Sequence, residues 1–432
     1  MIVSGWGNYP KIDCIVNSPQ TTGDIVRILP TGNAIARGGG RAYGDSALCD
    51  TNTIQMRGLD QFVEFDRVSG ILTASAGVQL RDIIETFLPR GWFLPVTPGT
   101  SYVTVGGAIA ADVHGKNHHQ AGTFCQHVYE IDLMLGSGEV LEISPAVYPD
   151  LFHATCGGMG LTGIILSAKI KLVPVKSGYI HQTTLPARNI DELFELFDVH
   201  SGVSYSVAWI DCLASHEALG RSVLLLGEHA DNGKLECDLA QKISVPFNAP
   251  NFLLNRWSIK AFNSLYYVKS KKQKHNNVTI SDYFYPLDRI GCWNRLYGSR
   301  GFIQYQFVIP RENGLENMRR ILNKITDSGE GSFLAVIKLF GEANANLLSF
   351  PFKGYTLALD FNINRKTFPL IRTLDDMVTQ IGGRIYLAKD AMMSADMFRN
   401  TYSRWKEFEA VRAKYGAIGK FSSAQSVRLG LK

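Results

Sequence analysis

The stretch Arg-Gly-Gly-Gly-Arg-Ala-Tyr-Gly-Asp-Ser (residues 37–46) follows a short apolar run and places three consecutive glycines where a strand must turn. A second glycine-rich stretch, Pro-Gly-Thr-Ser-Tyr-Val-Thr-Val-Gly-Gly-Ala, occupies residues 98–108. Because glycine has no Cβ, backbone N–H groups in such loops can converge on a phosphate without steric obstruction. Two loops of this kind, each beside a β-branched run, predict a cradle for a dinucleotide.

The spacing excludes the two commonest phosphate-binding motifs. A Rossmann unit requires G-x-G-x-x-G at a strand-to-helix turn and an acidic residue about twenty positions later. Gly40 is instead followed by Arg-Ala-Tyr-Gly-Asp, without an amphipathic helix, and neither loop carries a Walker lysine. The sequence therefore predicts a pyrophosphate held between two loops of a mixed α+β domain.

Composition narrows the class of protein. The chain has 432 residues, of which 45% are hydrophobic and 11% aromatic, as in a globular enzyme of two domains. The net charge of +5 is small and evenly spread, so we expect no nucleic-acid partner. Residues 1–7 lack the basic and apolar regions of a signal peptide, and no apolar run reaches membrane-span length, so we expect a cytoplasmic location. The seven cysteines form no C-x-x-C pair and predict neither a disulfide framework nor a zinc site.

The amino-acid composition of the chain changes near residue 179. Up to about Pro174, glycine and short β-branched runs predict strands joined by tight turns, with one amphipathic helix at Leu80–Pro89. Beyond Tyr179, aromatic strands alternate with longer helical segments such as Leu315–Thr326. The expected strands include Ile71–Ala76, Tyr129–Leu135, Gly163–Ile170, Tyr205–Ile210, Gly301–Ile309 and Arg384–Ala388, and a helix is expected around Ala395–Val411. We expect a first domain over residues 1–178 and a second domain over residues 179–383.

The most polar segment is Lys-Ser-Lys-Lys-Gln-Lys-His-Asn-Asn (residues 269–277), which has no apolar periodicity. Such a composition predicts a solvated or mobile loop. An alternative is a flap that meets an anionic substrate or a lipid surface.

The densest set of proton-handling residues follows the second glycine loop, at residues 112–119. His114, His118 and His119 could ligate zinc, but the Glu of H-E-x-x-H is absent and the flanking Gly-Lys-Asn suits a loop, so we expect no metal. A plain structural loop is a second alternative. We favour a site in which His114 and Lys116 face a substrate beside a cofactor.

Oxidation of an alcohol carbon removes a hydroxyl proton as well as a hydride, so a base or a cationic partner is needed near the hydroxyl. Lys116, Lys338 and Lys389 are candidates by context, and Lys338 interrupts an apolar run, which predicts that it faces a cavity or an acidic partner. Gln304 and Gln306 share one face of an expected strand, where they line a sugar pocket or form the wet side of a sheet.

These motifs resemble two nested families. Residues 37–46, residues 98–119 and Cys-Gly-Gly-Met-Gly-Leu-Thr-Gly-Ile (residues 156–164) look like the PCMH-type flavin-binding domain of the vanillyl-alcohol-oxidase-type flavoproteins. The motifs that resemble the narrower family of decaprenylphosphoryl-β-D-ribose 2-oxidases are Ser-Gly-Trp-Gly (4–7), His-Gly-Lys-Asn-His-His (114–119), Phe-Ile-Gln-Tyr-Gln-Phe-Val-Ile-Pro (302–310), Lys-Leu-Phe-Gly (338–341) and Tyr-Leu-Ala-Lys-Asp (386–390).

The resemblance implies a two-subdomain FAD-binding domain that residues 384–432 complete, with an inserted substrate domain of antiparallel sheet and flanking helices. It implies oxidation of the 2-hydroxyl of a polyprenyl-phosphate-linked pentose to a keto sugar in cell-envelope glycan (arabinan) synthesis. A short-chain reductase then completes an epimerisation, and a quinone or another acceptor reoxidises the flavin. Peripheral contact with the inner membrane is an expectation from the lipid substrate.

The resemblance also implies roles for residues. The catalytic residues that it implies are Lys389 and His114. The FAD-binding residues that it implies are Arg37, Gly38, Gly39, Gly40, Arg41, Ala42, Tyr43, Gly44, Asp45, Ser46, Gly99, Thr104, Val105, Gly106, Gly107, Ala111, Asp112, Val113, His114, Gly115, Asn117, Gly158, Ile164, Tyr386 and Lys389. The substrate-binding residues that it implies are Tyr43, Lys116, Trp209, Gln304, Gln306 and Lys338.

The sequence departs from the family pattern at three places. Arg41 stands where many members of the superfamily have a histidine bonded to the flavin, so we expect noncovalent FAD. Thr356 and Ala358 replace an asparagine and the cysteine that nitroaromatic inhibitors trap in the mycobacterial enzymes, so we expect escape from covalent capture. Val207 stands where a serine is expected.

Two other functions fit the same motifs. One is an FAD-dependent oxidase of free polyols or sugar lactones. The other is a non-catalytic scaffold that keeps a flavin pocket, against which the presence of both His114 and Lys389 argues.

Overall fold

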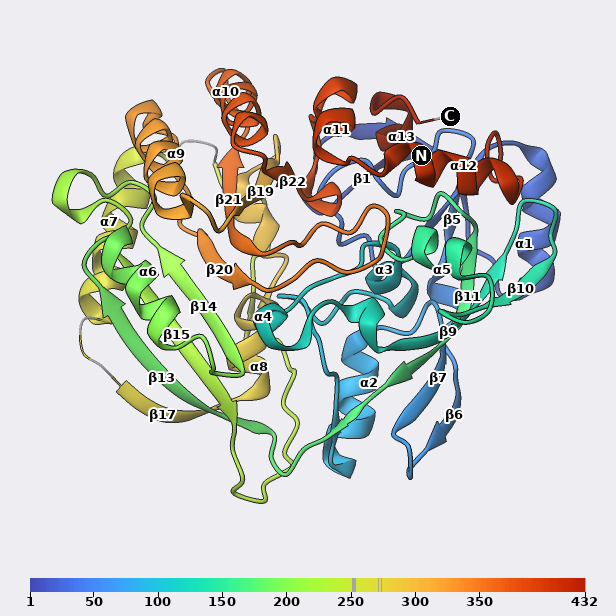
Figure 1. Cartoon of the computed structure of the whole chain (residues 1–432), viewed down its shortest axis with the longest axis horizontal. Helices are drawn as coiled ribbons and strands as arrows, with labels where there is room; N and C mark the ends of the chain where they lie inside the picture. The colour runs from blue at the N-terminus through green and yellow to red at the C-terminus, as the bar shows by residue number, and fades with distance from the viewer. Residues whose placement is uncertain (251–253, 271, 273, 432) are drawn as a thin grey trace.

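The structure is a computed structural model that describes residues 1–250, 254–270, 272 and 274–431. Figure 1 shows two large sheets side by side, and both are antiparallel. The chain starts in the right-hand half (blue), passes to the left-hand half (green and yellow) and returns to the right (red). The first and last parts of the chain therefore share one half of the molecule.

A small parallel sheet opens this half. Its strands, in spatial order, are β3 (Val16–Asn17), β5 (Asn52–Gln55) and β4 (Ala34–Arg37). α1 (Thr22–Ile28), which begins at a capping box of Thr21 and Asp24, packs Ile25 into the core of this sheet. The N–H of Ala34 donates to the carbonyl of Lys420 (2.8 Å), and Phe421 lies in the same core. Residues near the C-terminus thus extend the sheet that leads into the first glycine loop.

The five-stranded antiparallel sheet lies next to it. Its strands, in spatial order, are β10 (Val140–Ile143), β9 (Val128–Met134), β11 (Ile164–Lys171), β7 (Ile71–Ser75) and β6 (Phe62–Asp66). Burial alternates along β7, where Leu72 and Ala74 face the core. α3 (Val105–Ala110) packs on β7 and β11, and α2 (Leu80–Phe87) and α5 (Pro149–Thr155) belong to the same core. This packing fixes the second glycine loop, which runs into α3.

The second half holds an eight-stranded antiparallel sheet. Its strands, in spatial order, are β17 (Lys274–Thr279), β13 (Tyr179–Ala187), β15 (Ser222–His229), β14 (Tyr205–Ile210), β20 (Val336–Phe340), β21 (Gly354–Asn362), β19 (Phe302–Pro310) and β22 (Arg384–Ile385). α6 (Ile190–Val199), α9 (Gly314–Ser328) and α10 (Thr367–Gln380) pack on it. The hydroxyl of Tyr305 in β19 donates to Asp375 of α10 (2.9 Å). Because side chains alternate along a strand, Gln304 and Gln306 point to the opposite face.

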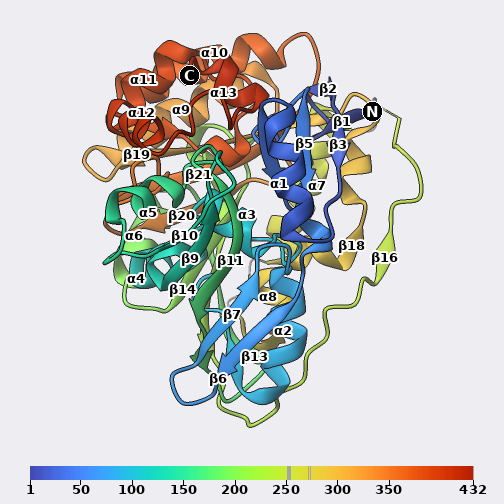
Figure 2. The same ribbon diagram turned by 90° about the vertical axis from the view of Figure 1, so that its right-hand side faces the viewer.

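Further strands and helices complete the two halves. They are β1 (Ile2–Ser4), β2 (Lys11–Asp13), β8 (Trp92–Phe93), β12 (Val173–Pro174), β16 (Ile243–Ser244), β18 (Ile290–Gly291), α4 (His118–Ala121), α7 (Arg256–Lys269), α8 (Ile280–Phe284), α11 (Ala395–Thr401), α12 (Trp405–Lys414) and α13 (Ala424–Arg428). Figure 2 shows the extended segment that carries β16 along the outer side of the molecule. In the described part of the chain, no helix combines the length and the apolar character that crossing a bilayer requires.

Most expected elements are confirmed, including the α+β class, but the last two differ. The strand predicted over Arg384–Ala388 ends at Ile385 and turns into a short 3₁₀ helix, Leu387–Lys389. The helix predicted around Ala395–Val411 is two helices, α11 and α12, because the chain breaks at Tyr402. The hydroxyl of Tyr402 donates to the carbonyl of Ile385 (2.6 Å), which fixes this break against the turn.

The polar segment is only partly a loop. Lys269 ends α7, residues 271 and 273 lie outside the described part, and Lys274–Thr279 forms the edge strand β17 paired with β13. The loop prediction is therefore wrong for residues 274–277. Side chains 274–277 are exposed, so no hydrophobic alternation marks the strand, and backbone pairing alone defines it.

Candidate active site

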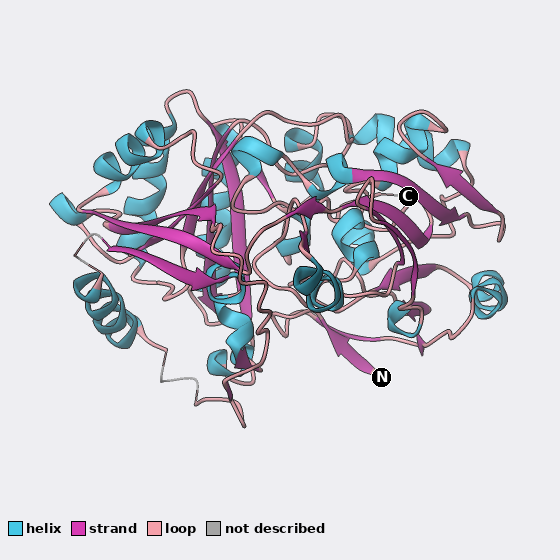
Figure 3. Cartoon of the chain, turned by 90° about the horizontal axis from the view of Figure 1, so that it is seen from below, coloured by secondary structure: helices cyan, strands magenta, loops and turns pink. Residues whose placement is uncertain are grey.

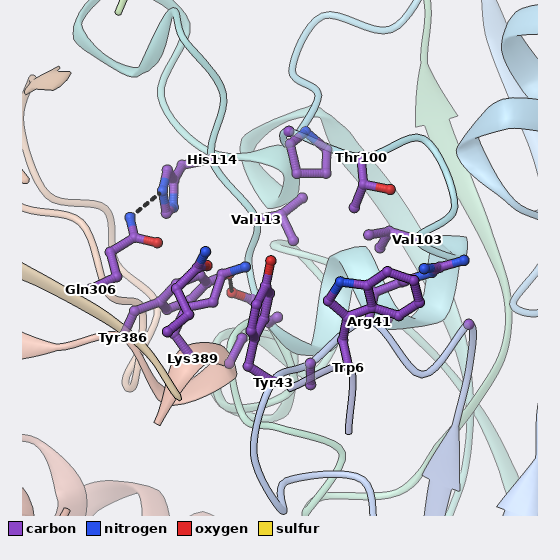
Figure 4. A pocket seen from close by; sticks show the side chains of 18 of the residues that line it. Trp6, Arg41, Tyr43, Thr100, Val103, Val113, His114, Gln306, Tyr386 and Lys389 are labelled. Atoms are coloured by element: carbon purple, nitrogen blue, oxygen red, sulfur yellow. Dashed lines mark hydrogen bonds between the residues drawn. The ribbon is translucent and has the colours of Figure 1, made fainter. Parts of the chain in front are cut away.

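A cavity of about 520 Å³ lies where the two halves meet, in the size range of small-molecule sites. Both glycine loops line it on one side, and the face of the eight-stranded sheet that is opposite α6, α9 and α10 lines it on the other. Figure 4 shows the meeting point, where Lys389 lies beside Tyr43 and His114 faces Gln306. A ligand in this cavity would touch residues from both sheets.

The glycines let the two loops touch each other. A Cβ on Gly38 would collide with the Thr104 side chain, and one on Gly39 would collide with the Tyr102 carbonyl. A Cβ on Gly99 would meet no atom within 4 Å, because this residue borders the cavity. Glycine is thus required at the first two positions for loop-on-loop packing, in addition to access for a phosphate.

The first loop has unused donors that suit a pyrophosphate. In the described residues, the backbone N–H groups of Gly39, Gly40, Arg41 and Ala42 donate no hydrogen bond, and the buried Nε of Arg41 has no partner. The Arg41 guanidinium lies 4.0 Å from the ring centroid of Trp6. Stacking holds this cation without neutralising it, so the loop retains positive charge and free donors toward the cavity. These features fit the diphosphate of FAD.

A carboxylate braces the second loop. Asp288 accepts hydrogen bonds from the Ser101 N–H (2.7 Å), the Ser101 hydroxyl (2.8 Å) and the Thr100 hydroxyl (2.7 Å). Burial raises the pKa of Asp288, although these donors and the charge of Arg41 oppose the rise. The second loop is therefore fixed from the substrate-side half of the chain.

The sheet face presents five polar side chains at matched register. Gln304 pairs with Asp360 across β19 and β21, Gln306 pairs with Ala358, and Lys338 of β20 pairs with Thr356. Gln304 donates to Asp360 (2.6 Å). Burial raises the pKa of Asp360 to about 7, against the hydrogen bond from Gln304 and the positive charge of Lys389. Because side chains alternate along each strand, these groups all lie on one wall of the cavity.

His114 is held as a neutral ring. Gln306 Nε2 donates to its Nε2 (3.0 Å), so the His114 proton resides on Nδ1, which has no partner although it is buried. Burial is the main cause that lowers the pKa of His114 well below its ordinary value, and Lys338 adds to the effect. The ring packs beside Phe340 and Tyr386, with centroids at 4.8 and 5.1 Å. It can therefore donate a hydrogen bond from a fixed position.

Lys389 stands on the turn after β22. The N–H of Tyr386 donates to the carbonyl of Gln306 (2.9 Å), and the N–H of Tyr43 donates to the carbonyl of Ala388 (2.9 Å). Lys389 Nζ consequently lies 3.8 Å from the centroid of the Tyr43 ring. The turn is thus fixed between the sheet wall and the first glycine loop.

Three lysines in the cavity lack a carboxylate at ion-pair distance among the described residues: Lys116, Lys338 and Lys389. Desolvation lowers the pKa of Lys389 to about 7, with Asp360 opposing and Lys338 adding to the fall. Desolvation likewise lowers the pKa of Lys338 to about 8 and that of Lys116 to about 7. Lys116 Nζ is further held by the Tyr283 carbonyl and lies 4.3 Å from the Tyr283 ring centroid. Among the described residues these lysines form no ion pair, although Asp360 and Asp288 also line the cavity, and an anionic ligand would stabilise their charged forms.

Most residues implied by the family resemblance line this cavity. They are Gly38, Gly39, Gly40, Arg41, Ala42, Tyr43, Ser46, Gly99, Thr104, Gly106, Gly107, Ala111, Val113, His114, Gly115, Lys116, Trp209, Gln304, Gln306, Lys338, Tyr386 and Lys389. His118 and His119 are engaged elsewhere: His118 Nδ1 accepts from the Gly341 N–H (3.1 Å), and His119 Nε2 bonds the Val203 carbonyl (2.9 Å).

Eight implied residues do not line the cavity and lie behind its walls. They are Arg37, Gly44, Asp45, Val105, Asp112, Asn117, Gly158 and Ile164. Asp112 is fully buried and its carboxylate accepts from Asn344, Asn346 and Ser349, at 2.7 to 2.9 Å. Asp112 therefore ties the loop after β20 to the loop that carries His114.

The sequence analysis did not single out Trp6, Asp288 or Asp360 as site side chains, although each lines the cavity. Asp360 carried a usable signal, because a carboxylate in the apolar run 354–361 needs a partner. Asp288 lies far from the glycine loops in sequence, and Trp6 lies outside any periodic segment. Tertiary contact alone brings them to the site.

Comparison with known proteins now identifies the chain. The family described as FAD binding domain matches residues 13–144. Decaprenylphosphoryl-beta-D-ribose oxidase of Mycolicibacterium smegmatis is 37% identical over 446 aligned residues, which cover 99% of this chain and 97% of that protein. The chain belongs to the decaprenylphosphoryl-β-D-ribose oxidase family. It is an FAD-dependent oxidoreductase, as the family resemblance implied.

Other relatives of this chain share lower sequence identity with it. An uncharacterized protein in the mprA 5′ region of Streptomyces coelicolor is 30% identical over 82% of this chain and all of its own length. L-gulono-1,4-lactone dehydrogenase of Mycobacterium tuberculosis is 23% identical over 94% of each chain. The lower identity of the lactone enzyme disfavours the lactone-oxidase alternative.

The unpaired lysines predict a pH-dependent stability of the FAD-free protein. Their pKa values in the fold are about 7 to 8, whereas lysine in the unfolded chain titrates near 10.4. Between pH 7 and 8 these lysines hold more protons in the unfolded chain, so their contribution to the free energy of unfolding rises with pH by about 2 kcal/mol. Asp360 and Asp375, whose pKa values in the fold are raised to about 7, oppose this rise. Urea unfolding at the two pH values measures this rise.

The double variant Lys338→Met, Lys389→Met should reduce that rise. Lys406→Met, at an exposed position of α12, provides the matched control and should keep it. An unchanged rise in the double variant would show that these lysines do not carry the effect.

Proposed function

We propose that this protein oxidises the 2-hydroxyl of a polyprenyl-phosphate-linked pentose to a keto sugar. The observation that carries the proposal is the cavity wall on which Lys116, Lys338 and Lys389 lie without a carboxylate partner beside Gln304 and Gln306. Lysines meet a phosphate, and amide side chains form the paired donor and acceptor contacts that sugar hydroxyls need. The name of the M. smegmatis relative includes a prenyl-phosphoryl ribose, which agrees with this chemistry.

Each side chain has a proposed task. FAD, when bound between the glycine loops, supplies the acceptor for the hydride. Lys389, whose pKa lies near 7, accepts the hydroxyl proton in its neutral form. His114 donates its free Nδ1–H to the reacting sugar or to the cofactor edge, and Gln306 holds the ring in that tautomer. Lys338 and Lys116 hold the phosphate, and Trp209 and Tyr43 flank the sugar.

We further propose that residues 1–178 and 384–432 form the FAD-binding domain and that residues 179–383 form the substrate domain. The contact between Ala34 and Lys420 supports the return of the last segment to the first domain, and β22 (residues 384 and 385), which still pairs with β19, places the junction at the edge of the eight-stranded sheet. Arg41, stacked on Trp6, takes the place of a flavin-linking histidine, so FAD is held noncovalently.

The reaction partners are part of the same proposal. A keto sugar on a lipid carrier calls for a reductase of the short-chain class to complete an epimerisation in the synthesis of a cell-envelope glycan. The reduced cofactor is reoxidised by a quinone or another acceptor. The protein works on the cytoplasmic side, in peripheral contact with the inner membrane that holds its substrate.

An anaerobic visible spectrum tests the reaction. Addition of polyprenyl-phosphoribose to the purified holoenzyme should bleach the flavin band, and acid precipitation should leave all flavin in the supernatant. A spectrum that stays oxidised with this compound, but bleaches with a free polyol or a sugar lactone, would overturn the substrate class. Flavin retained in the precipitate would overturn noncovalent binding.

Two lysines in one cavity should affect different kinetic constants. Lys389→Met should lower kcat by about 10²- to 10⁴-fold, because the proton acceptor is lost, and should keep FAD bound. Lys338→Met should chiefly raise KM, because a phosphate contact present before and during reaction is lost. Steady-state kinetics with flavin content measured by absorbance separates the two. A Lys389→Met enzyme of normal kcat would remove this residue from the proton transfer.

Nitroaromatic inhibitors should leave no covalent adduct on this enzyme. Ala358 lines the cavity at the position where the resemblance places the trapped cysteine, and an alanine offers no nucleophile. Mass spectrometry after turnover with such a compound should show the unmodified mass, whereas the variant Ala358→Cys should gain the mass of the adduct. An adduct on the unmodified enzyme would contradict this expectation.

A further inference from the structure

α7 exposes an apolar stripe on its outer side. Trp257, Leu265 and Val268 are 77%, 72% and 58% exposed, and Ala261 lies between them. These positions are spaced by four, four and three residues, so they fall on one side of the helix. In Figure 3 the helix lies at the left-hand edge of the molecule. In the described residues no other helix exposes three large apolar side chains in a row of this kind.

The opposite side of α7 attaches the helix to the sheet. Ile259, Asn263 and Tyr267 are buried on that side. Asn263 Nδ2 donates to Asp211 (2.9 Å), and Arg221 donates to the Ser264 hydroxyl (2.8 Å). The helix is therefore held by one face, and its exposed stripe is not used by the core.

The stripe adjoins the active-site cavity. Phe262 and Tyr266, on the flank of the stripe, line the cavity. The Tyr266 ring lies 4.6 Å from that of Trp209, and the Phe262 ring lies 5.8 Å from that of Phe333. An apolar chain that leaves the cavity past these rings would reach the outer surface of α7.

The charged residues in the sequence around α7 are all basic. From Leu239 to Ser281 the sequence contains no Asp or Glu, and it contains the basic residues Lys242, Arg256, Lys260, Lys269, Lys271, Lys272 and Lys274. Of these, Lys260 and Lys269 lie on α7 and are exposed, and neither forms an ion pair in the described residues. A helix with Trp and Leu on one side and lysines beside them is typical of segments that lie in the interface of an anionic bilayer.

We propose that α7 docks the enzyme on an anionic lipid bilayer. Trp257, Leu265 and Val268 enter the interface, and the neighbouring lysines meet the lipid head groups. The cavity then opens at the membrane surface, so that a prenyl chain stays among lipids while its sugar reaches Lys389. This inference rests on the proposed lipid-linked substrate. The lysine-rich border favours lipid over a protein partner, because lysine is depleted at the centre of protein interfaces.

Vesicle sedimentation of the holoenzyme tests the docking. The protein should bind phosphatidylcholine vesicles that contain phosphatidylglycerol, and the variant Trp257→Ser, Leu265→Ser should bind them at least about tenfold more weakly. Val68→Ser, Val427→Ser, at exposed sites on other elements, is the matched control and should bind normally. Lys260→Gln, Lys269→Gln should lose about fivefold per charge on anionic vesicles only.

The outcomes are separable. Absence of vesicle binding by the unmodified enzyme, or equal binding by the Trp257 and Leu265 variant, overturns the docking. A lipid-free dimer in sedimentation velocity that this variant abolishes would assign the stripe to a second copy and also overturn it. Anaerobic bleaching by a short-prenyl, water-soluble analogue should be the same in all variants. Its loss in every protein would refute the proposed function, whereas its retention without vesicle binding refutes the docking alone.

Discussion

The active site depends on one arginine that forms ion pairs with two carboxylates. Arg428 donates to Asp45 (2.7 Å) and to Asp390 (2.9 Å), two carboxylates that are almost fully buried. Asp45 follows Tyr43 in the first glycine loop, and Asp390 follows Lys389 in the turn after β22. One guanidinium thus fixes the face-to-face position of Tyr43 and Lys389. Removal of one member would leave a charge buried without its partner, a change that costs about 3–5 kcal/mol.

The rest of the cavity differs from the ion pairs of Arg428 in its charge: its lysines are not paired with carboxylates. Behind the wall, Arg428 pairs with the carboxylates of Asp45 and Asp390, whereas the cavity lysines form no ion pair among the described residues. Water excluded by the aromatic rings lowers the proton affinity of those lysines, which suits Lys389 to proton transfer near neutral pH. Unpaired lysines in one cavity destabilise the fold, and a bound anionic ligand reduces this destabilisation. Ligand binding and fold stability are therefore coupled in this enzyme.

The sequence predicted the site's composition better than its layout. Alternation along Gln304 and Gln306 placed both on one face correctly, because period two is a local property. The glycine loops were located, but their packing on one another could not be inferred without the register between them. The family resemblance implied Asp112 and Asp45 as FAD-binding residues, but their side chains lie behind the cavity wall, because a loop directs neighbouring side chains to opposite sides. The edge strand β17 escaped notice because neither of its faces is buried.

The contact between Ala34 and Lys420 and the clamp at Arg428 also have a temporal consequence. During synthesis, the first glycine loop leaves the ribosome long before the residues that pin it in place. The cradle for FAD can close only after the chain has been made through Arg428. Cofactor loading therefore follows the synthesis of α13, because this helix carries the arginine that holds the cradle together.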